Sequence, residues 1–185
     1  MINWPIDFPS IASPATSHLQ LKLRPLREDD IDSIFNACQD PTISEFTRVP
    51  FPYDRSMAED FVRESDVAYR NHVTISFAIE VDGEFAGTIG LHSIQLGDHM
   101  AEIGYWVKQD FRGRGICTAA LKMMSDFSLD VMGFRRLEAL ADFDNSASQK
   151  VMEKAGFTRD ALLKNRATKR DGRQIDMALY SMARG

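Results

Sequence analysis

The chain has 185 residues, of which 44% are hydrophobic and 26% are charged. This length and composition allow one domain with a full hydrophobic core and exclude a disordered tail or linker. The net charge of -5, from 22 Lys and Arg against 27 Asp and Glu, argues against nucleic acid as a partner, because non-specific nucleic-acid binding depends on a basic surface.

The sequence gives no indication of a membrane, a secretory route or a metal. No run of about 18 apolar residues is present, so we expect no membrane association. Residues 1–17 contain no Lys or Arg, unlike the basic start of a signal peptide. Cys38 and Cys117 lie far apart and match no metal-binding spacing. We therefore expect a cytoplasmic protein without a metal site.

Residues 1–18 are predicted to form an extended N-terminal arm, because Pro5, Pro9 and Pro14 interrupt any helix there. Four large apolar side chains in this segment would gain nothing from full exposure to water. We expect them to pack on the domain or on a partner subunit: Trp4, Ile6, Phe8 and Ile11. Residues 19–185 are predicted to form a single domain.

The first part of that domain is predicted to contain one strand and two helices. Apolar and polar residues alternate over 19–24, the period of a half-buried strand. Acidic residues at 28–30 precede apolar residues at helical spacing, and Pro41 marks the predicted end of this first helix. After a proline-rich loop, Ser56 and Glu59 have the spacing of a capping box that would start a second helix, running to about Arg70.

The middle of the chain is predicted to be an antiparallel meander. Two β-prone runs, 75–81 and 84–94, are separated by Asp82 and Gly83, a residue pair that suits a tight hairpin turn. A third strand is expected over 101–108.

The last part of the chain alternates between helices and strands. A broad apolar stripe predicts a helix over 115–132, stopped by Gly133. A strand over 136–141, a helix over 146–155 and two strands over 157–168 and 173–181 follow. The predicted order βααβββαβαββ, with no repeat or change of composition, indicates one α/β domain.

The segment with the clearest chemistry is the loop between the strand at 101–108 and the following helix. The backbone N–H groups at a helix start have no intrahelical partner and favour an anion, and Gly113 and Gly115 allow close approach of a phosphate. Arg112 and Arg114 add positive charge. A mononucleotide P-loop is excluded, because Gly115 is not followed by Lys and then Ser or Thr. A dinucleotide-binding loop is disfavoured, because Thr118 stands at the third glycine's place.

Two motifs instead resemble the GNAT superfamily of acyl-CoA-dependent N-acetyltransferases. The loop matches that family's R-x-x-G-x-[G/A] pattern at Arg112 and Gly115, with Cys117 at the final small position. Residues 145–157 resemble the N-x-x-S-x-x-[VI]-x-E-K-x-G-F signature of the branch that contains the ribosomal-protein acetyltransferases RimJ and RimL. Residues 21–30 and 169–180 also resemble that branch, so the likeness covers about 19–183.

The resemblance implies a fold and a co-substrate site. It implies an α+β fold whose mixed sheet splays between the fourth and fifth strands and carries helices on both faces. Acetyl-CoA would lie in that gap, with its pyrophosphate on main-chain N–H groups of the loop. The residues implied in acetyl-CoA binding are Tyr105, Trp106, Val107, Arg112, Gly113, Arg114, Gly115, Ile116, Cys117, Thr118 and Asn145.

The resemblance also implies direct attack of an amine on the thioester, with no covalent enzyme intermediate. Glu102 is our candidate for the base; alternatively, it is a strand carboxylate that merely faces solvent. Ser148 is our candidate for the hydrogen-bond donor to the leaving thiolate; alternatively, it merely caps the helix. An α-amine, with a pKa of about 8, is an easier acceptor than a lysine amine at about 10.4. Cys117 is not expected to be a nucleophile, since no His is placed beside it by the sequence.

The acceptor class stays open at this stage. We expect a protein or peptide N-terminus, and the alternatives are a small amine (polyamine, aminoglycoside or amino acid) or an acyl-CoA-binding module without turnover. Basic residues around the last predicted turn form either a solvated face or a surface for an acidic protein: Lys164, Arg166, Lys169, Arg170 and Arg173. The chain is expected to be a monomer or a homodimer.

Overall fold

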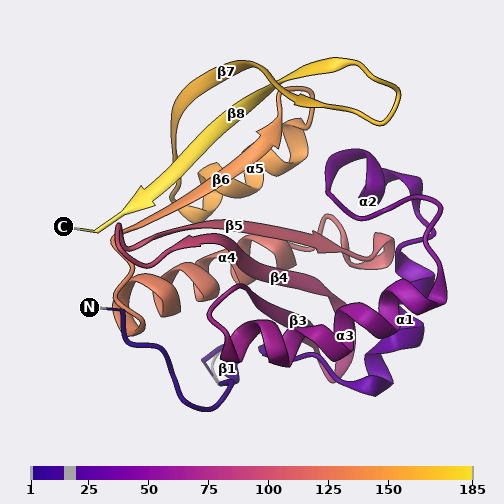
Figure 1. Cartoon of the computed structure of the whole chain (residues 1–185), viewed down its shortest axis with the longest axis vertical. Coiled ribbons are helices and arrows are strands. Elements are labelled where there is room, and N and C mark those ends of the chain that lie inside the picture. Colours follow the sequence, from indigo (N-terminus) through magenta and orange to yellow (C-terminus); the bar gives the residue numbers. More distant parts are fainter. Residues whose placement is uncertain (1, 15–19, 185) are drawn as a thin grey trace.

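The computed structural model describes residues 2–14 and 20–184. Within these ranges the chain forms a mixed sheet of eight strands in the order β1-β2-β3-β4-β5-β6-β8-β7, and the predicted mixed α/β fold is confirmed (Figure 1). The strands are β1 (Ile11–Ala12), β2 (Leu21–Pro25), β3 (Ile75–Val81), β4 (Glu84–Gln95), β5 (Met100–Val107), β6 (Arg136–Asp142), β7 (Thr158–Thr168) and β8 (Gln174–Ala183). The α-helices are α1 (Ile31–Ala37), α2 (Pro41–Phe46), α3 (Arg55–Arg70), α4 (Ile116–Asp126) and α5 (Ser146–Ala155).

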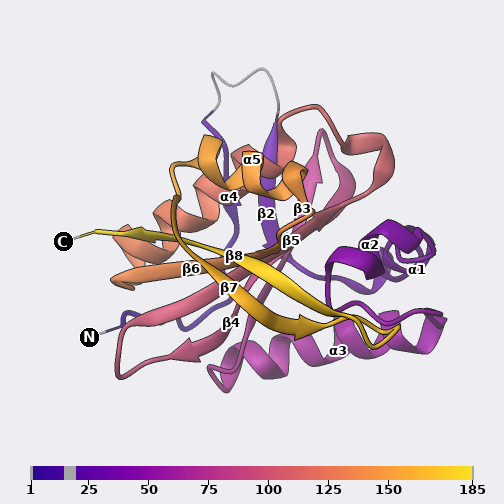
Figure 2. The same ribbon diagram turned by 90° about the horizontal axis from the view of Figure 1, so that it is seen from above.

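Helices cover both faces of the sheet, as expected. Figure 2 shows α4 and α5 on one face and α3 on the other. The larger core cluster joins the sheet to α4 through side chains such as Leu121 and Met124, which are fully buried. A smaller cluster, which includes Ile34 and Val62, lies under α1 and α3. Among the described residues, no helix combines the length and apolar composition that crossing a membrane requires.

The sheet opens between β5 and β6, which confirms the predicted splay between the fourth and fifth strands of the domain. These parallel strands pair only over Met100–Glu102 and Arg136–Glu138. The rest of β5 continues along β4, while β6 pairs with β8 over its whole length. In the described part of the chain, residues 103–107 therefore have no partner strand on the β6 side, and main-chain groups there face a gap.

The β3–β4 hairpin forms as predicted. Asp82 and Gly83 both have positive φ, 51° and 84°, which is the conformation that a two-residue turn of this type needs. The helix predicted over 115–132 is α-helical only to Asp126 and continues as a π-helical turn over Phe127–Val131. Gly133, with φ 82°, follows it as the predicted stop.

Two expectations in the first half of the domain are wrong. Pro41 begins helix α2 and does not merely mark the end of α1. Asp40 caps α2 by accepting a hydrogen bond from the Thr42 N–H. A proline fits the first helical position, because no N–H is needed there. Ser56 is not a cap, because α3 begins one residue earlier, at Arg55, after Asp54.

The N-terminal arm packs on the domain through its aromatic residues. Phe8 stacks on Tyr69 with ring centroids 4.1 Å apart, and Trp4 lies 5.2 Å from the same ring. Ile11 pairs with Leu23, so the arm adds the short strand β1 to the sheet. Ile6 is the exception to the expected packing, since it is 97% exposed. Residues 1 and 15–18 of the predicted arm, and the first residue of the strand predicted over 19–24, lie outside the described residues.

Candidate active site

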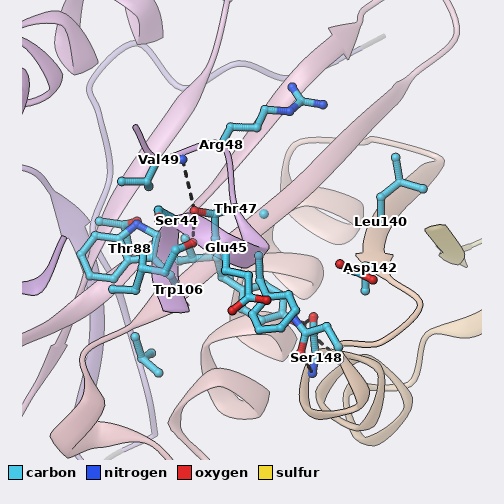
Figure 3. Close-up of a pocket in the computed structure, with 18 of the residues that line it drawn as sticks. Ser44, Glu45, Thr47, Arg48, Val49, Thr88, Trp106, Leu140, Asp142 and Ser148 are labelled. Atoms are coloured by element: carbon cyan, nitrogen blue, oxygen red, sulfur yellow. Dashed lines mark hydrogen bonds between the residues drawn. The ribbon is translucent and has the colours of Figure 1, made fainter. Parts of the chain in front are cut away.

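A large cleft of about 1620 Å³ lies where β5 and β6 separate. Its lining comes from α2 and the loop after it, from β4, β5 and β6, from the glycine loop at 112–118, from α5 and from the β7–β8 hairpin. Figure 3 shows Ser44, Glu45 and Thr47 near Trp106, with Ser148 and Asp142 contributed from the other half of the molecule. Two parts of the chain that are far apart in sequence therefore meet at one site.

The glycine loop presents unused N–H groups at the start of α4. Gly113 and Gly115 have φ of 73° and 78°, and a Cβ atom built on either would meet no atom within 4 Å. Among the described residues, no acceptor is present for the N–H groups of residues 113–118. Open space above free donors at a helix start fits a diphosphate group.

The two loop arginines differ from what the sequence suggests. The N–H of Arg112 donates to the Gln109 carbonyl, so it is not one of the free donors. Its guanidinium donates to Asp40 (2.7 Å) and Thr42 (3.0 Å) at the start of α2, and is thus occupied. The Arg114 guanidinium lies 5.2 Å from the centre of the Phe111 ring.

A hydrogen-bonded group of three residues lies at the start of α5. Asn145 caps the helix: its Oδ1 accepts a hydrogen bond from the Ser148 N–H at 3.0 Å. The Ser148 hydroxyl shares a hydrogen bond of 3.0 Å with the Tyr105 hydroxyl. Burial raises the pKa of Tyr105, so this hydroxyl stays protonated. Because Asn145 makes the cap, Ser148 is not needed for capping and its hydroxyl faces the cleft.

Replacing Asn145 with Ala should lower the free energy of unfolding by about 1 kcal/mol, because the cap hydrogen bond is lost. For a chain of this size, that corresponds to a decrease in Tm of about 2–4 °C. Thermal unfolding followed by circular dichroism measures it. Asn145→Asp retains a capping oxygen and should keep the wild-type Tm; a lower Tm in both variants would show that capping is not the reason.

The strand residues expected near the co-substrate point in two directions. Tyr105 and Val107 pack against the core cluster under α4, whereas Trp106 packs against the cluster under α1 and α3 and meets Phe85 edge to face. Alternation along a strand requires this. Tyr105 and Trp106 cannot both place their side chains against one ligand on the same face of β5.

Glu102 lies on the same face of β5 as Trp106 and is flanked by an imidazole and a guanidinium group. Its Oε1 is 3.7 Å from His92 Nε2 and 3.8 Å from an Arg48 Nη atom. Its side chain is 19% exposed, and no residue of the described chain donates a hydrogen bond to its carboxylate. A Cβ at Gly104 would come within 3.2 Å of His92 Nε2, so glycine leaves room for the imidazole.

The environment of His92 favours its neutral form. Burial lowers its pKa; the Glu102 carboxylate acts in the opposite direction, and Arg48 adds to the decrease. The Glu102 carboxylate is partly exposed in the cleft, so an incoming amine can reach it and donate a hydrogen bond to it.

The surroundings of Cys117 disfavour the thiolate form that a nucleophile requires. Burial raises the pKa of this thiol to about 12, and the nearby Arg112 reduces this increase only in part. Within the described ranges, no group of three or more His, Cys, Asp and Glu side chains is placed to hold a metal ion.

Most of the basic residues of the β7–β8 hairpin are engaged within the chain. Lys169 forms ion pairs with Asp142 (2.8 Å) and Glu45 (3.5 Å), and the Asp142 carboxylate raises the pKa of Lys169. Arg170 donates to the carbonyls of Val49 and Phe51. Lys164 pairs with Asp176, and Arg173 with Asp171. The contacts of Lys169 and Arg170 hold the hairpin tip against α2 and the loop after it. Because these basic side chains already have partners, the hairpin is less available to bind an acidic protein.

The sequence predicted Glu102 and Ser148 in the site and His92 at the side of the cleft, but it assigned His92 no role and missed Arg48 and the contact from Arg112 to Asp40. His92 lies directly opposite Glu102 in the β4–β5 register, so extending the predicted meander residue by residue would have paired these two residues. Arg48 lies in a loop whose path depends on α2, and no sequence period predicts that position.

The open sheet that splays beside a glycine loop with free N–H groups has the arrangement that the resemblance to acyl-CoA-dependent N-acetyltransferases predicts. Residues 20–158 match the family model described as an acetyltransferase (GNAT) domain. The chain belongs to this family and is a GNAT N-acetyltransferase.

Relatives of known name and structure agree with this assignment. The chain is 28% identical over 142 residues to spermidine N(1)-acetyltransferase of Escherichia coli K12, covering 75% of this chain and 73% of that protein. It is 31% identical over 88 residues to the ribosomal-protein-serine acetyltransferase of the same organism, covering 48% and 49%. The structure of Mycobacterium smegmatis RimJ in complex with CoA-disulfide superposes with a TM-score of 0.81 at 26% identity, covering 97% and 88%.

Proposed function

We propose that this protein transfers the acetyl group of acetyl-CoA to the α-amine at the N-terminus of a protein or peptide. The observation that supports this best is the Glu102 carboxylate, which lies in the cleft without a hydrogen-bond donor from the described chain. It offers an acceptor for an amine on the face of β5 opposite to Ser148. The relative named as a ribosomal-protein-serine acetyltransferase supports a protein acceptor.

The co-substrate half of the proposal depends on main-chain groups. Acetyl-CoA supplies the acyl thioester. The free N–H groups of residues 113–118 hold its diphosphate, and Gly113 and Gly115 leave room for it. Main-chain groups of β5 beyond Glu102 that face β6 have no partner strand among the described residues, so they can bind an amide-containing arm as a partner strand would. A main-chain N–H near Tyr105 polarises the reacting carbonyl.

Proton transfer is divided between two residues on opposite sides of the site. Glu102 takes the proton that the α-ammonium must lose before or during attack. Ser148, held by Tyr105 and by the start of α5, donates a hydrogen bond to the departing thiolate, whose ordinary pKa near 8.5 requires only modest stabilisation. Tyr105 acts as a positioning residue in this scheme. Free CoA and an N-acetylated acceptor leave the enzyme.

A second acceptor class has one observation in its favour, the relative named spermidine N(1)-acetyltransferase. Under this alternative the cleft would take a polyamine, and Glu102 would bind one of its ammonium groups.

An acceptor panel with detection of free CoA separates these functions. Peptides that start with Ser or Ala, spermidine and free amino acids would each be incubated with acetyl-CoA and the full chain. Turnover of the peptides supports the proposal, and turnover of spermidine alone replaces it with the second class. If calorimetry shows that acetyl-CoA binds and no acceptor is turned over, the protein is an acyl-CoA-binding module.

Glu102→Gln should lower kcat/KM for the peptide by about tenfold to a hundredfold, because the amide retains the shape of Glu102 but cannot take a proton. The KM for acetyl-CoA should not change. The deficit should shrink above about pH 8, where the α-amine loses its proton without help. Rates measured from pH 6.5 to 9.5 give this profile.

Glu84→Gln is the matched control, since Glu84 is an exposed carboxylate at the start of β4, paired with Lys108 and outside the cleft. It should behave as wild type. A Glu102→Gln deficit that stays constant over the whole pH range would assign Glu102 a structural role.

A further inference from the structure

Of the five arginines that line the cleft, Arg48 and Arg166 have no hydrogen-bond acceptor among the described residues, and Arg48 is the one that lies beside Glu102. Arg112 is bound to Asp40 and Thr42, Arg170 to main-chain carbonyls, and Arg173 to Asp171. The Arg48 side chain is 79% exposed, and in the described chain its one charged neighbour is Glu102, at 3.8 Å, which is longer than a hydrogen bond. Figure 3 shows Arg48 extending away from Ser148.

The spacing of Arg48 and Glu102 suits the amine and the carbonyl oxygen of the first residue of a peptide. The nitrogen of an N-terminal residue and the carbonyl oxygen of the same residue lie about 3 Å apart by standard backbone dimensions. An amine that donates to Glu102 therefore brings its own carbonyl oxygen within reach of the Arg48 guanidinium. Each of the two groups gains the partner that it lacks in the free protein.

The same guanidinium is unfavourable for a polyamine. An acceptor with a second ammonium a few bonds from the first would bring that charge close to Arg48, and like charges repel over such distances where water is partly excluded. Rejection of a competitor by repulsion is a common source of specificity.

We infer that Arg48 selects the acceptor: it binds the carbonyl oxygen of the first residue of a peptide whose amine is held by Glu102, and it disfavours acceptors that carry a second ammonium. This inference depends on the proposed N-terminal acetyltransferase function. It adds a residue that distinguishes the two acceptor classes raised above.

The test compares three acceptors with the wild type, Arg48→Ala and Arg48→Gln. A Ser-starting tetrapeptide has both amine and carbonyl, ethanolamine has neither a carbonyl nor a second charge, and spermidine has the second charge. For Arg48→Ala we expect kcat/KM to fall about tenfold with the peptide, the effect of one hydrogen bond to a charged group. It should stay within about twofold for ethanolamine and rise about threefold to tenfold for spermidine, as expected from the loss of one exposed repulsive charge.

Arg48→Gln retains a donor but loses the charge. It should recover part of the peptide activity while keeping the higher spermidine activity. Arg70→Ala is the matched control, because Arg70 is equally exposed, pairs with Asp66 on α3 and does not line the cleft. It should leave all three ratios unchanged.

The outcomes separate the inference from the function on which it depends. If wild-type enzyme does not acetylate the peptide, the proposed function fails and this inference fails with it. If wild-type enzyme acetylates the peptide but Arg48→Ala changes all three acceptors equally, or changes none, the proposed function stands and the role of Arg48 is overturned. A peptide-specific loss with a gain for spermidine supports it.

Discussion

Gly115→Val should abolish binding of CoA and acetyl-CoA while the chain remains folded. Gly115 has φ of 78°, and its missing side chain leaves open space beside the free N–H groups of residues 113–118. A valine would fill that space and force the loop out of a conformation that β-branched residues avoid. Losing two or three hydrogen bonds to a charged group, at about 1.5–3 kcal/mol each, weakens binding by about a hundredfold or more. Isothermal titration calorimetry with CoA measures this.

Gly83→Val is the control for backbone strain. Gly83 also has a positive φ, 84°, and open space around it, but it lies in the β3–β4 turn outside the cleft. This variant should lose a similar amount of stability and keep the wild-type Kd for CoA. Equal weakening of CoA binding in both variants would mean that loss of stability, and not loss of the phosphate site, explains the Gly115 result.

Ser148→Ala should lower kcat by about tenfold to a thousandfold, the range found when a proton-donating group is removed from a reaction. The fold should be preserved, because the helix cap belongs to Asn145 and the N–H of residue 148 remains to bond with it. The KM for acetyl-CoA should change little. Steady-state rates at saturating acetyl-CoA, together with the Tm of each variant, test this prediction.

Ser146→Ala is the matched control: it makes the same substitution two residues earlier on α5, at an exposed position outside the cleft. Its kcat should equal that of the wild type. Tyr105→Phe should reproduce part of the Ser148→Ala loss, because it removes the hydroxyl that positions Ser148. A wild-type kcat in Ser148→Ala would remove this residue from the proposed chemistry.

Local sequence patterns predicted most of the fold because they depend on short-range physics. The alternation in the meander and the Asp82-Gly83 turn correspond directly to β3 and β4. The prediction of a helix boundary was wrong where one residue type fits two positions. Pro41 is compatible both with the end of one helix and with the first turn of the next. Asp40 followed by Pro41 was the available signal for the second choice.

The candidate site was predictable where it depends on one segment and not where it depends on tertiary contacts. The loop at 113–118 has its free donors because of local backbone geometry. Arg112 matches the family pattern, yet its guanidinium is bound to α2, 72 residues away along the chain. The positions of Arg48 and His92 beside Glu102 likewise result from how the loop after α2 and strand β4 pack against β5.

Both edges of the sheet have features that disfavour strand pairing between molecules. At one edge, β1 is only two residues long and lies between Pro9 and Pro14, which have no N–H to offer to an incoming strand. At the other edge, β7 carries Lys164 and Arg166 on either side of Asn165, whose positive φ of 49° interrupts the regular strand. Both features oppose the addition of a strand from a neighbouring molecule, so neither edge of the sheet is a favourable template for edge-to-edge pairing.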